Sequence, residues 1–143
     1  MKKSIQIIAL TIALVLCTLT LFSCAGSTFD KIRANFEKNG YVLSEEDKIQ
    51  TTITVDGAEV TVTIHTFKEK GEGLDAIIAR SADVWEFESG EVLEKAIAEN
   101  SSIQAILKDA DQSKYVNGNC ILMTFPIFNE DALAIFNGET IEK

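Results

Sequence analysis

The spacing of apolar residues divides this chain of 143 residues into two parts. The segment Ile5 to Phe22 is apolar apart from one glutamine and three threonines. Beyond it, apolar residues recur either every three or four positions or every second position, as in helices and strands with one buried face. The pattern predicts an N-terminal hydrophobic segment followed by a folded domain.

The domain begins with a helical pattern. Ser27 or Thr28 can cap this helix, with Asp30 in capping-box position after Ser27, and Asn39-Gly40 ends it. We therefore expect a first helix between these two signals, with an apolar face made of Phe29, Ile32 and Phe36.

After this helix, apolar residues recur at every second position, as in a strand. Tyr41 to Leu43 is expected to be a short extended piece, and Ser44 to Asp47 an acidic turn. From Ile49 to Phe67, alternation on both sides of Asp56-Gly57 predicts a hairpin with one buried side. That side consists of Ile49, Ile53, Val55, Val60, Val62 and Ile64. The opposite side is rich in threonine and carries His65, so the sequence predicts that this single histidine is exposed to solvent.

The next segments combine strand and helix patterns. Lys68 to Gly73 is a polar loop, and Leu74 to Arg80 fits a buried strand better than a helix. The reason is that Val84 to Glu88 alternates aromatic residues with acids, as the arm of a second hairpin would. Ser89 caps the clearest helix pattern, with a break expected at Asn100 to Ser102 and a core face of Val92, Leu93, Ala96, Ile97, Ile103, Ile106 and Leu107.

The C-terminal part of the sequence predicts one more strand and one more helix. Asp109 to Ser113 is expected to be a loop, and Tyr115 to Phe125 a strand that Pro126 stops. Asn129 caps the final helix and Asn137-Gly138 closes it, with Ala132, Leu133 and Phe136 facing inward. The sum is a single two-layer α+β domain, an antiparallel sheet packed against helices.

Charge identifies the N-terminal segment as an export signal. Residues 1–23 contain no acidic residue, and Lys2 and Lys3 precede the hydrophobic region. Leu21-Phe22-Ser23-Cys24 resembles the lipobox of bacterial lipoproteins, with an aliphatic residue three before the cysteine and a small residue just before it. Phe22 is bulkier than is usual there. The resemblance implies cleavage between Ser23 and Cys24 and a diacylglyceryl thioether on Cys24.

This assignment predicts a lipoprotein signal peptide at residues 1–23, a short tether at 24–27 and one α+β domain at 28–143. Two alternatives remain open. An apolar stretch of 18 residues is near the minimum for an uncleaved spanning helix, and Ser23-Cys24-Ala25 also fits ordinary signal cleavage. We expect the outer face of the cytoplasmic membrane. The outer membrane is the alternative, because, by resemblance to known sorting signals, Ala25 is not the aspartate associated with inner-membrane retention.

Composition limits the partners of the domain. Removing the signal takes away two lysines and no acid, so Cys24 to Lys143 carries 11 Lys and Arg against 22 Asp and Glu, a net side-chain charge of −11. Such a charge disfavours nucleic acid and anionic lipid surfaces, because phosphates would be repelled. The expected partner is an envelope protein with a basic patch.

The three cysteines have different expected fates. Cys17 leaves with the signal, Cys24 carries lipid, and Cys120 is then alone in the domain. Within an apolar strand pattern, Cys120 is expected to be a small buried apolar residue without a chemical role.

Catalytic, metal and cofactor motifs are missing from the sequence. One histidine on an open strand face offers no base for a serine or cysteine nucleophile, and neither clustered zinc ligands nor a glycine-rich phosphate loop is found. Asp109 to Ser113 begins like a calcium loop, but Lys114 stands where the sharp turn needs glycine and Cys120 where the loop needs glutamate. We therefore expect no catalytic, metal or cofactor residue.

Paired carboxylates are the best indication of an enzyme. Glu86 and Glu88 would point to one side of a strand, roughly 7 Å apart, within the range of glycosidase pairs. Adjacent strand positions rarely provide two unlike environments, so a solvated acidic face is the preferred interpretation. Trp85 is expected to pack in the core, with a sugar-stacking platform as the alternative.

A second resemblance covers most of the domain. Four short motifs look like those of small uncharacterised bacterial lipoproteins: Asn39-Gly40-Tyr41-Val42, Gly71-Glu72-Gly73-Leu74, Phe87-Glu88-Ser89 and Gly118-Asn119. The predicted hairpin is longer than in that pattern, and the resemblance implies no functional residue. The sequence thus predicts a membrane-anchored, non-enzymatic binding module; the alternative is an envelope enzyme acting on glycan through Glu86 and Glu88.

Overall fold

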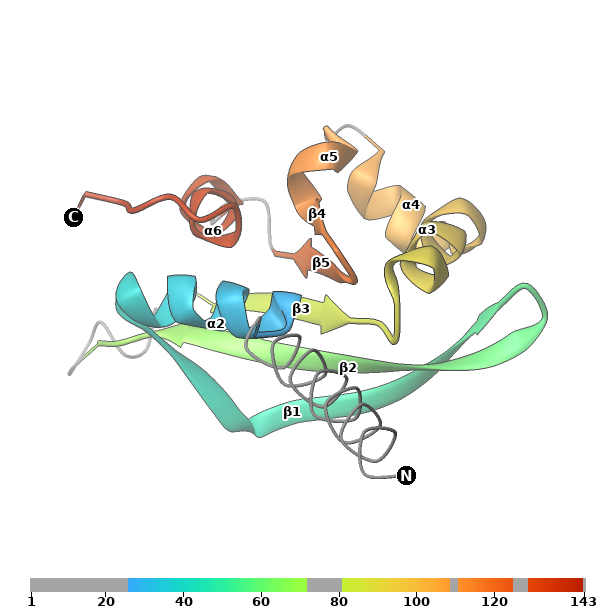
Figure 1. The fold of residues 1–143 in the computed structure, drawn as a ribbon, viewed down its shortest axis with the longest axis horizontal. Helices are drawn as coiled ribbons and strands as arrows, with labels where there is room; N and C mark the ends of the chain where they lie inside the picture. The colour runs from blue at the N-terminus through green and yellow to red at the C-terminus, as the bar shows by residue number, and fades with distance from the viewer. Residues whose placement is uncertain (1–25, 72–80, 109–110, 125–128, 143) are drawn as a thin grey trace, which may run out of the picture.

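A computed structural model of the chain describes residues 26–71, 81–108, 111–124 and 129–142. Within them, antiparallel strands form one sheet and helices pack against it, which confirms the predicted α+β domain (Figure 1). The strands are β1 (Tyr41–Val55), β2 (Ala58–Glu69), β3 (Ser81–Glu86), β4 (Val116–Asn117) and β5 (Cys120–Met123). The helices are α2 (Thr28–Lys38), α3 (Gly90–Glu99), α4 (Ser101–Leu107), α5 (Gln112–Tyr115) and α6 (Asn129–Phe136).

Helix α2 begins at the predicted capping box. The Ser27 hydroxyl accepts a hydrogen bond from the backbone N–H of Asp30 at 3.1 Å, and the Asp30 carboxylate accepts one from the backbone N–H of Ser27 at 2.9 Å. This reciprocal pair satisfies donors that the first turn would otherwise leave free. The three predicted apolar residues of α2 are buried against the sheet: Phe29, Ile32 and Phe36.

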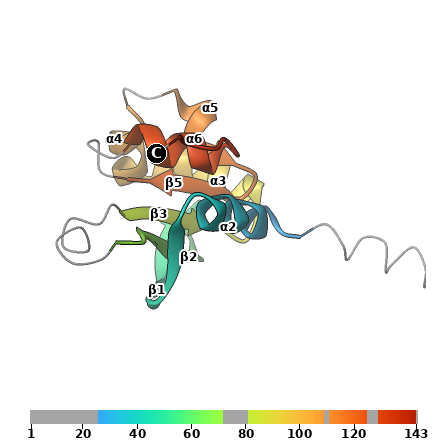
Figure 2. The same cartoon turned by 90° about the vertical axis from the view of Figure 1, so that its left-hand side faces the viewer.

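The end of α2 is tied to the C-terminal segment. The buried side chain of Asn39 donates hydrogen bonds to the backbone carbonyls of Asn35 and Glu139, and its own carbonyl accepts one from the backbone N–H of Ile141. The bonds with Glu139 and Ile141 join segments 100 and 102 residues apart. Figure 2 shows α6 and α2 side by side, and the two helices are in contact.

Strands β1 and β2 form the predicted hairpin, which is longer than expected. Asp56 and Gly57 form its two-residue turn, with φ of 53° and 75°, the positive values that a type I′ turn requires. The predicted acidic turn at Ser44 to Asp47 is wrong. These residues lie inside β1, where the register with β2 shifts between Ser44 and Ile49. A local irregularity in a continuous strand carries the same polar residues as a turn, which explains the error.

The prediction of one buried side for this hairpin holds only near its tip. Val62 and Phe67 are both fully buried, yet they lie on opposite faces because strand residues alternate. Two-stranded ribbons twist strongly, so the face turned toward the helices changes along the ribbon (Figure 1). Ile49, predicted to be buried, is 54% exposed.

The remaining strands complete the order β1-β2-β3-β5-β4. The predicted single strand from Tyr115 to Phe125 is wrong in its boundaries. Tyr115 ends helix α5, and β4 and β5 are two short strands joined at Gly118. Gly118 has φ of 57°, and a Cβ there would lie 2.7 Å from Oγ1 of Thr28, so the turn needs glycine for both its backbone and its packing. All four residues of β5 are buried, which places this strand in the core.

The helices after β3 follow the predicted signals. Ser89 caps α3, and the helical pattern breaks at Asn100, whose side chain accepts hydrogen bonds from the backbone of Ser102 and Ile103 to begin α4. The predicted loop at Asp109 to Ser113 contains the start of α5, which Asp111 caps.

Helix α6 ends as predicted at Asn137-Gly138. Gly138 has φ of 91°, its N–H bonds to the carbonyl of Ile135, and the next N–H, of Glu139, bonds to the carbonyl of Ala134. This is a Schellman cap. The inward residues of α6 are Ala132, Leu133, Ile135 and Phe136.

Several predictions lie outside the described residues: the signal peptide with Ser23 and Cys24, the strand at 74–80, and the stop at Pro126. Among the residues that are described, no helix is long and apolar enough to cross a membrane.

Candidate functional site

The most unusual polar group of the domain is His65, which lies inside the core. It is only 4% exposed, so the prediction of a solvent-exposed histidine is wrong. His65 and Phe67 share the face of β2 that meets α2, and both stack with phenylalanines of this helix. The ring of His65 lies on that of Phe29, with centroids 3.7 Å apart and an interplanar angle of 23°.

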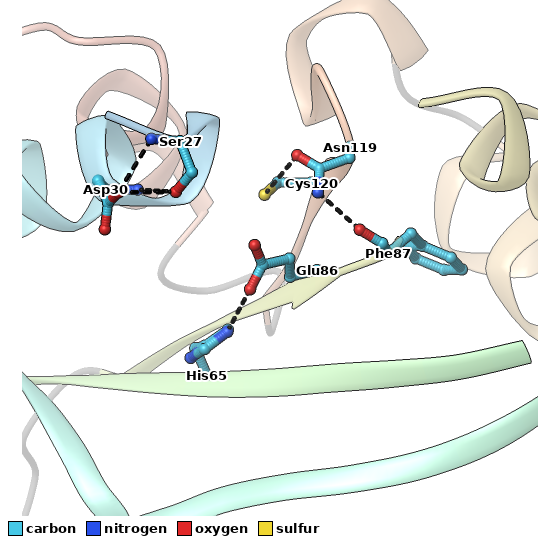
Figure 3. A network of polar contacts seen from close by, with 7 residues as sticks. All are labelled: Ser27, Asp30, His65, Glu86, Phe87, Asn119 and Cys120. Carbon is cyan, nitrogen blue, oxygen red and sulfur yellow. Dashed lines mark hydrogen bonds and ion pairs between the residues drawn. The ribbon is translucent and has the colours of Figure 1, made fainter. Parts of the chain in front are cut away.

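Glu86 is the polar partner of this histidine. It ends β3 directly opposite Thr63 of β2, which places its carboxylate diagonally across from His65. Nε2 of His65 and Oε2 of Glu86 are 2.9 Å apart, while Nδ1 of His65 is buried and has no hydrogen-bond partner in the described part of the chain (Figure 3). A carboxylate only accepts, so Nε2 carries the proton of the neutral ring and Nδ1 is a bare acceptor.

Burial controls the charge of His65. Desolvation lowers the pKa of His65, and the hydrogen bond and negative charge of Glu86 oppose this effect only in part. Charged groups of β1 act weakly in opposite directions, since Lys48 lowers the pKa of His65 and Glu45 raises it. Protonation would also create a second buried N–H donor at Nδ1. The pair is therefore a neutral imidazole hydrogen-bonded to a carboxylate.

Cys120 lies on the other side of Glu86, directly opposite it in β5. Burial, followed by the charge of Glu86, raises the pKa of the Cys120 thiol to about 12. The neighbouring Asn119 accepts a weak hydrogen bond from the thiol and donates one to the backbone carbonyl of Phe87 at 2.6 Å. The thiol stays protonated at neutral pH and is a poor nucleophile. The prediction of a small buried residue at position 120 is confirmed.

The other candidate residues are not brought together. Strand β3 ends at Glu86 and Glu88 lies beyond it, exposed, so the two do not alternate on one strand and that prediction is wrong. Trp85 is partly buried and packs against the core, as expected from the sequence. Asp111 accepts hydrogen bonds from the backbone and side chain of Ser113. Among the described residues, no group of three or more histidine, cysteine and acidic side chains is arranged to hold a metal ion.

Sequence reasoning missed the cluster of His65, Glu86 and Phe29. One signal was present: Phe67 has the same alternation as His65, and such a large apolar residue indicates that this face becomes buried at the end of β2. Comparisons with protein families, curated proteins and solved structures found no match for this chain.

Proposed function

We propose that this chain is a bacterial lipoprotein, anchored through lipid on Cys24 at the outer face of the cytoplasmic membrane, and that its domain is a non-enzymatic module that binds a basic envelope protein. The observation that carries the proposal is the order of features at the N-terminus. Two lysines, an apolar stretch and Leu21-Phe22-Ser23-Cys24 follow one another as in a lipoprotein signal.

The start of α2 supports a short tether. Ser27 already belongs to the capping box of α2, so only Ala25 and Gly26 lie between Cys24 and this cap in the sequence. Ala25 to Ser27 span roughly 10 Å even when fully extended. Phe29, one turn into the domain, packs against the sheet. The domain would therefore lie next to the membrane that holds the lipid.

Charge supports the choice of partner. After signal removal the side chains carry a net charge of −11, and three basic residues of the described surface lie beside acids of the same domain. Arg33 pairs with Glu37 at 2.7 Å, and Lys95 with Glu91 at 3.2 Å. Lys68 likewise pairs with Asp47. The surplus carboxylates favour a partner with a basic patch and disfavour anionic lipid and nucleic acid.

The polar cluster of His65, Glu86 and Cys120 does not supply an activated nucleophile. The histidine is buried and neutral, and the neighbouring thiol has a raised pKa, whereas a catalytic cysteine needs a thiolate. The alternative of a glycan enzyme depended on Glu86 and Glu88 side by side on one strand, and β3 ends between them. Nothing in the part of the chain that the structure describes favours that alternative.

The proposal is tested by crosslinking in native membranes. The full chain is compared with a variant in which two exposed acids of β1 are reversed, Glu45→Lys and Glu46→Lys. We expect one envelope protein to be enriched with the wild type, through crosslinked peptides rich in lysine and arginine, and to be reduced with the variant. Enrichment of no envelope protein would contradict the proposed binding role, and equal enrichment by both chains would contradict a contribution of these two acids to it.

A further inference from the structure

Strand β1 has an open edge. It is the first strand in the order β1-β2-β3-β5-β4, and no strand of the described residues pairs with its outer side. Strand β1 is 15 residues long, and an edge of this length presents a row of backbone N–H and C=O groups that another strand can pair with.

The two halves of this edge differ. In the first half, the register shift after Ser44 and the charged run Glu45 to Lys48 interrupt the strand, and such features protect natural edges from pairing. The second half, Ile49 to Val55, contains no charge and no proline and keeps a regular ladder with β2. Its exposed side chains are Ile49, Gln50, Thr52 and Thr54.

This second half is also complementary to itself. We propose that two copies of this chain join through Ile49 to Val55 as antiparallel neighbours, with Thr52 opposite Thr52 of the second copy. The order of residues around Thr52 places Gln50 opposite Thr54, polar with polar. At each end the exposed Ile49 lies opposite Val55, whose side chain is buried in its own domain. Thr51 meets Ile53, an ordinary pair for a strand surface.

Charge complementarity favours this register. Just beyond the seven pairs, Lys48 of one copy would come near the acidic turn residue Asp56 of the other, at both ends of the symmetric contact. In a domain of net charge −11, the uncharged edge is thus a place where two copies can approach without direct repulsion.

The pairing goes beyond the proposed function and does not depend on it. Lipid anchoring would raise the local concentration of copies in the membrane plane and so favour the contact. The contact itself consists of backbone hydrogen bonds and side-chain contacts along the seven residue pairs. It joins two sheets across their β1 edges.

Cysteine scanning of the full chain in its own membranes tests the proposal. Single substitutions are made from Gln50 to Thr54, and mild oxidation is followed by non-reducing electrophoresis. Directly opposite residues have Cα atoms about 4.5 to 5.5 Å apart, within disulfide range, so Thr52→Cys should give a disulfide dimer. Thr54→Cys is the matched control, because its two copies would lie roughly 14 Å apart.

A mixed experiment fixes the register independently. Chains with Gln50→Cys and Thr54→Cys, carrying different tags, should form a disulfide with each other and not with themselves. Adding Thr52→Lys to both chains places two ammonium groups opposite each other and should remove this mixed disulfide. Protease resistance equal to the wild type shows that each variant is folded. A folded Thr52→Cys chain that stays monomeric, a dimer maximum at another position, or a mixed disulfide that survives Thr52→Lys would overturn the proposal.

Discussion

The imidazole of His65 stacks on the phenyl ring of Phe29, with ring centroids 3.7 Å apart. This contact joins β2 to the first turn of α2, the helix that directly follows the predicted lipid anchor. Because Glu86 holds Nε2 and nothing in the described residues holds Nδ1, this buried position favours the neutral form of the histidine. The charge of one buried ring is thereby linked to the stability of the domain.

The stability of the domain should therefore fall as the pH falls below about 6.5, the ordinary pKa of histidine in an unfolded chain. Burial lowers the pKa of His65 in the folded state. Between the folded and unfolded pKa values the unfolded chain binds more protons, so stability is complete above this window and is lost as pH decreases through it. Urea unfolding at pH 7.5 and pH 5 measures the change.

The matched control is His65→Phe, which keeps an aromatic ring against Phe29 and removes the titrating group. Its unfolding midpoint should change less between the two pH values than that of the wild type. The carboxylates with lowered pKa values, Asp47 and Asp111, titrate below this window. An equal change in both proteins would show that His65 is not the source.

Glu86→Gln should lower the pKa of His65 further. The amide keeps an acceptor for Nε2–H but removes the negative charge that raises the pKa of His65. The chain has only one histidine, so its imidazole signal in an NMR titration reports this pKa directly. A pKa that rises in the variant would contradict the assigned hydrogen bond.

Cys120 should resist thiol reagents in the folded domain. Burial and the charge of Glu86 raise the pKa of its thiol to about 12, and the thiolate is the reactive form. A chain carrying Cys24→Ser and lacking residues 1–23 has this cysteine as its only thiol. Ellman's reagent should label it rapidly in concentrated urea and very slowly without urea; rapid labelling of the native protein would contradict the described burial.

Ser27→Ala should destabilise the domain by about 1 kcal/mol, the usual cost of losing a helix cap. The variant loses the hydroxyl that accepts from the N–H of Asp30 and donates to the Asp30 carboxylate, while the backbone N–H of residue 27 still donates to that carboxylate. Thr28→Ser is a suitable comparison, because it retains a hydroxyl beside Gly118. Denaturant unfolding of the two variants measures the difference, and an unchanged midpoint for Ser27→Ala would argue against the cap.

Local signals predicted the parts of this fold that short-range chemistry determines. The capping box at Ser27, the turn at Asp56-Gly57, the helix break at Asn100 and the cap at Gly138 each depend on a few neighbouring residues. The α+β class followed from their order along the chain.

The candidate site could not be predicted in the same way. The burial of His65 depends on the twist of the β1–β2 ribbon and on its contact with Phe29 of a distant element. Its bond to Glu86 depends on the register between β2 and β3. The acidic turn was wrong because an irregularity inside a strand and a true turn share the same polar residues, and only the pairing across β1 and β2 distinguishes them.

Palmitate labelling tests the central claim, lipid on Cys24, most directly. The full-length wild type and a Cys24→Ala variant are expressed in bacterial cells with radioactive palmitate, and the chain is isolated by immunoprecipitation. The lipoprotein account predicts label on the wild type and none on the variant, which should also retain its signal peptide. Label that survives Cys24→Ala, or a wild type that carries none, would contradict the account.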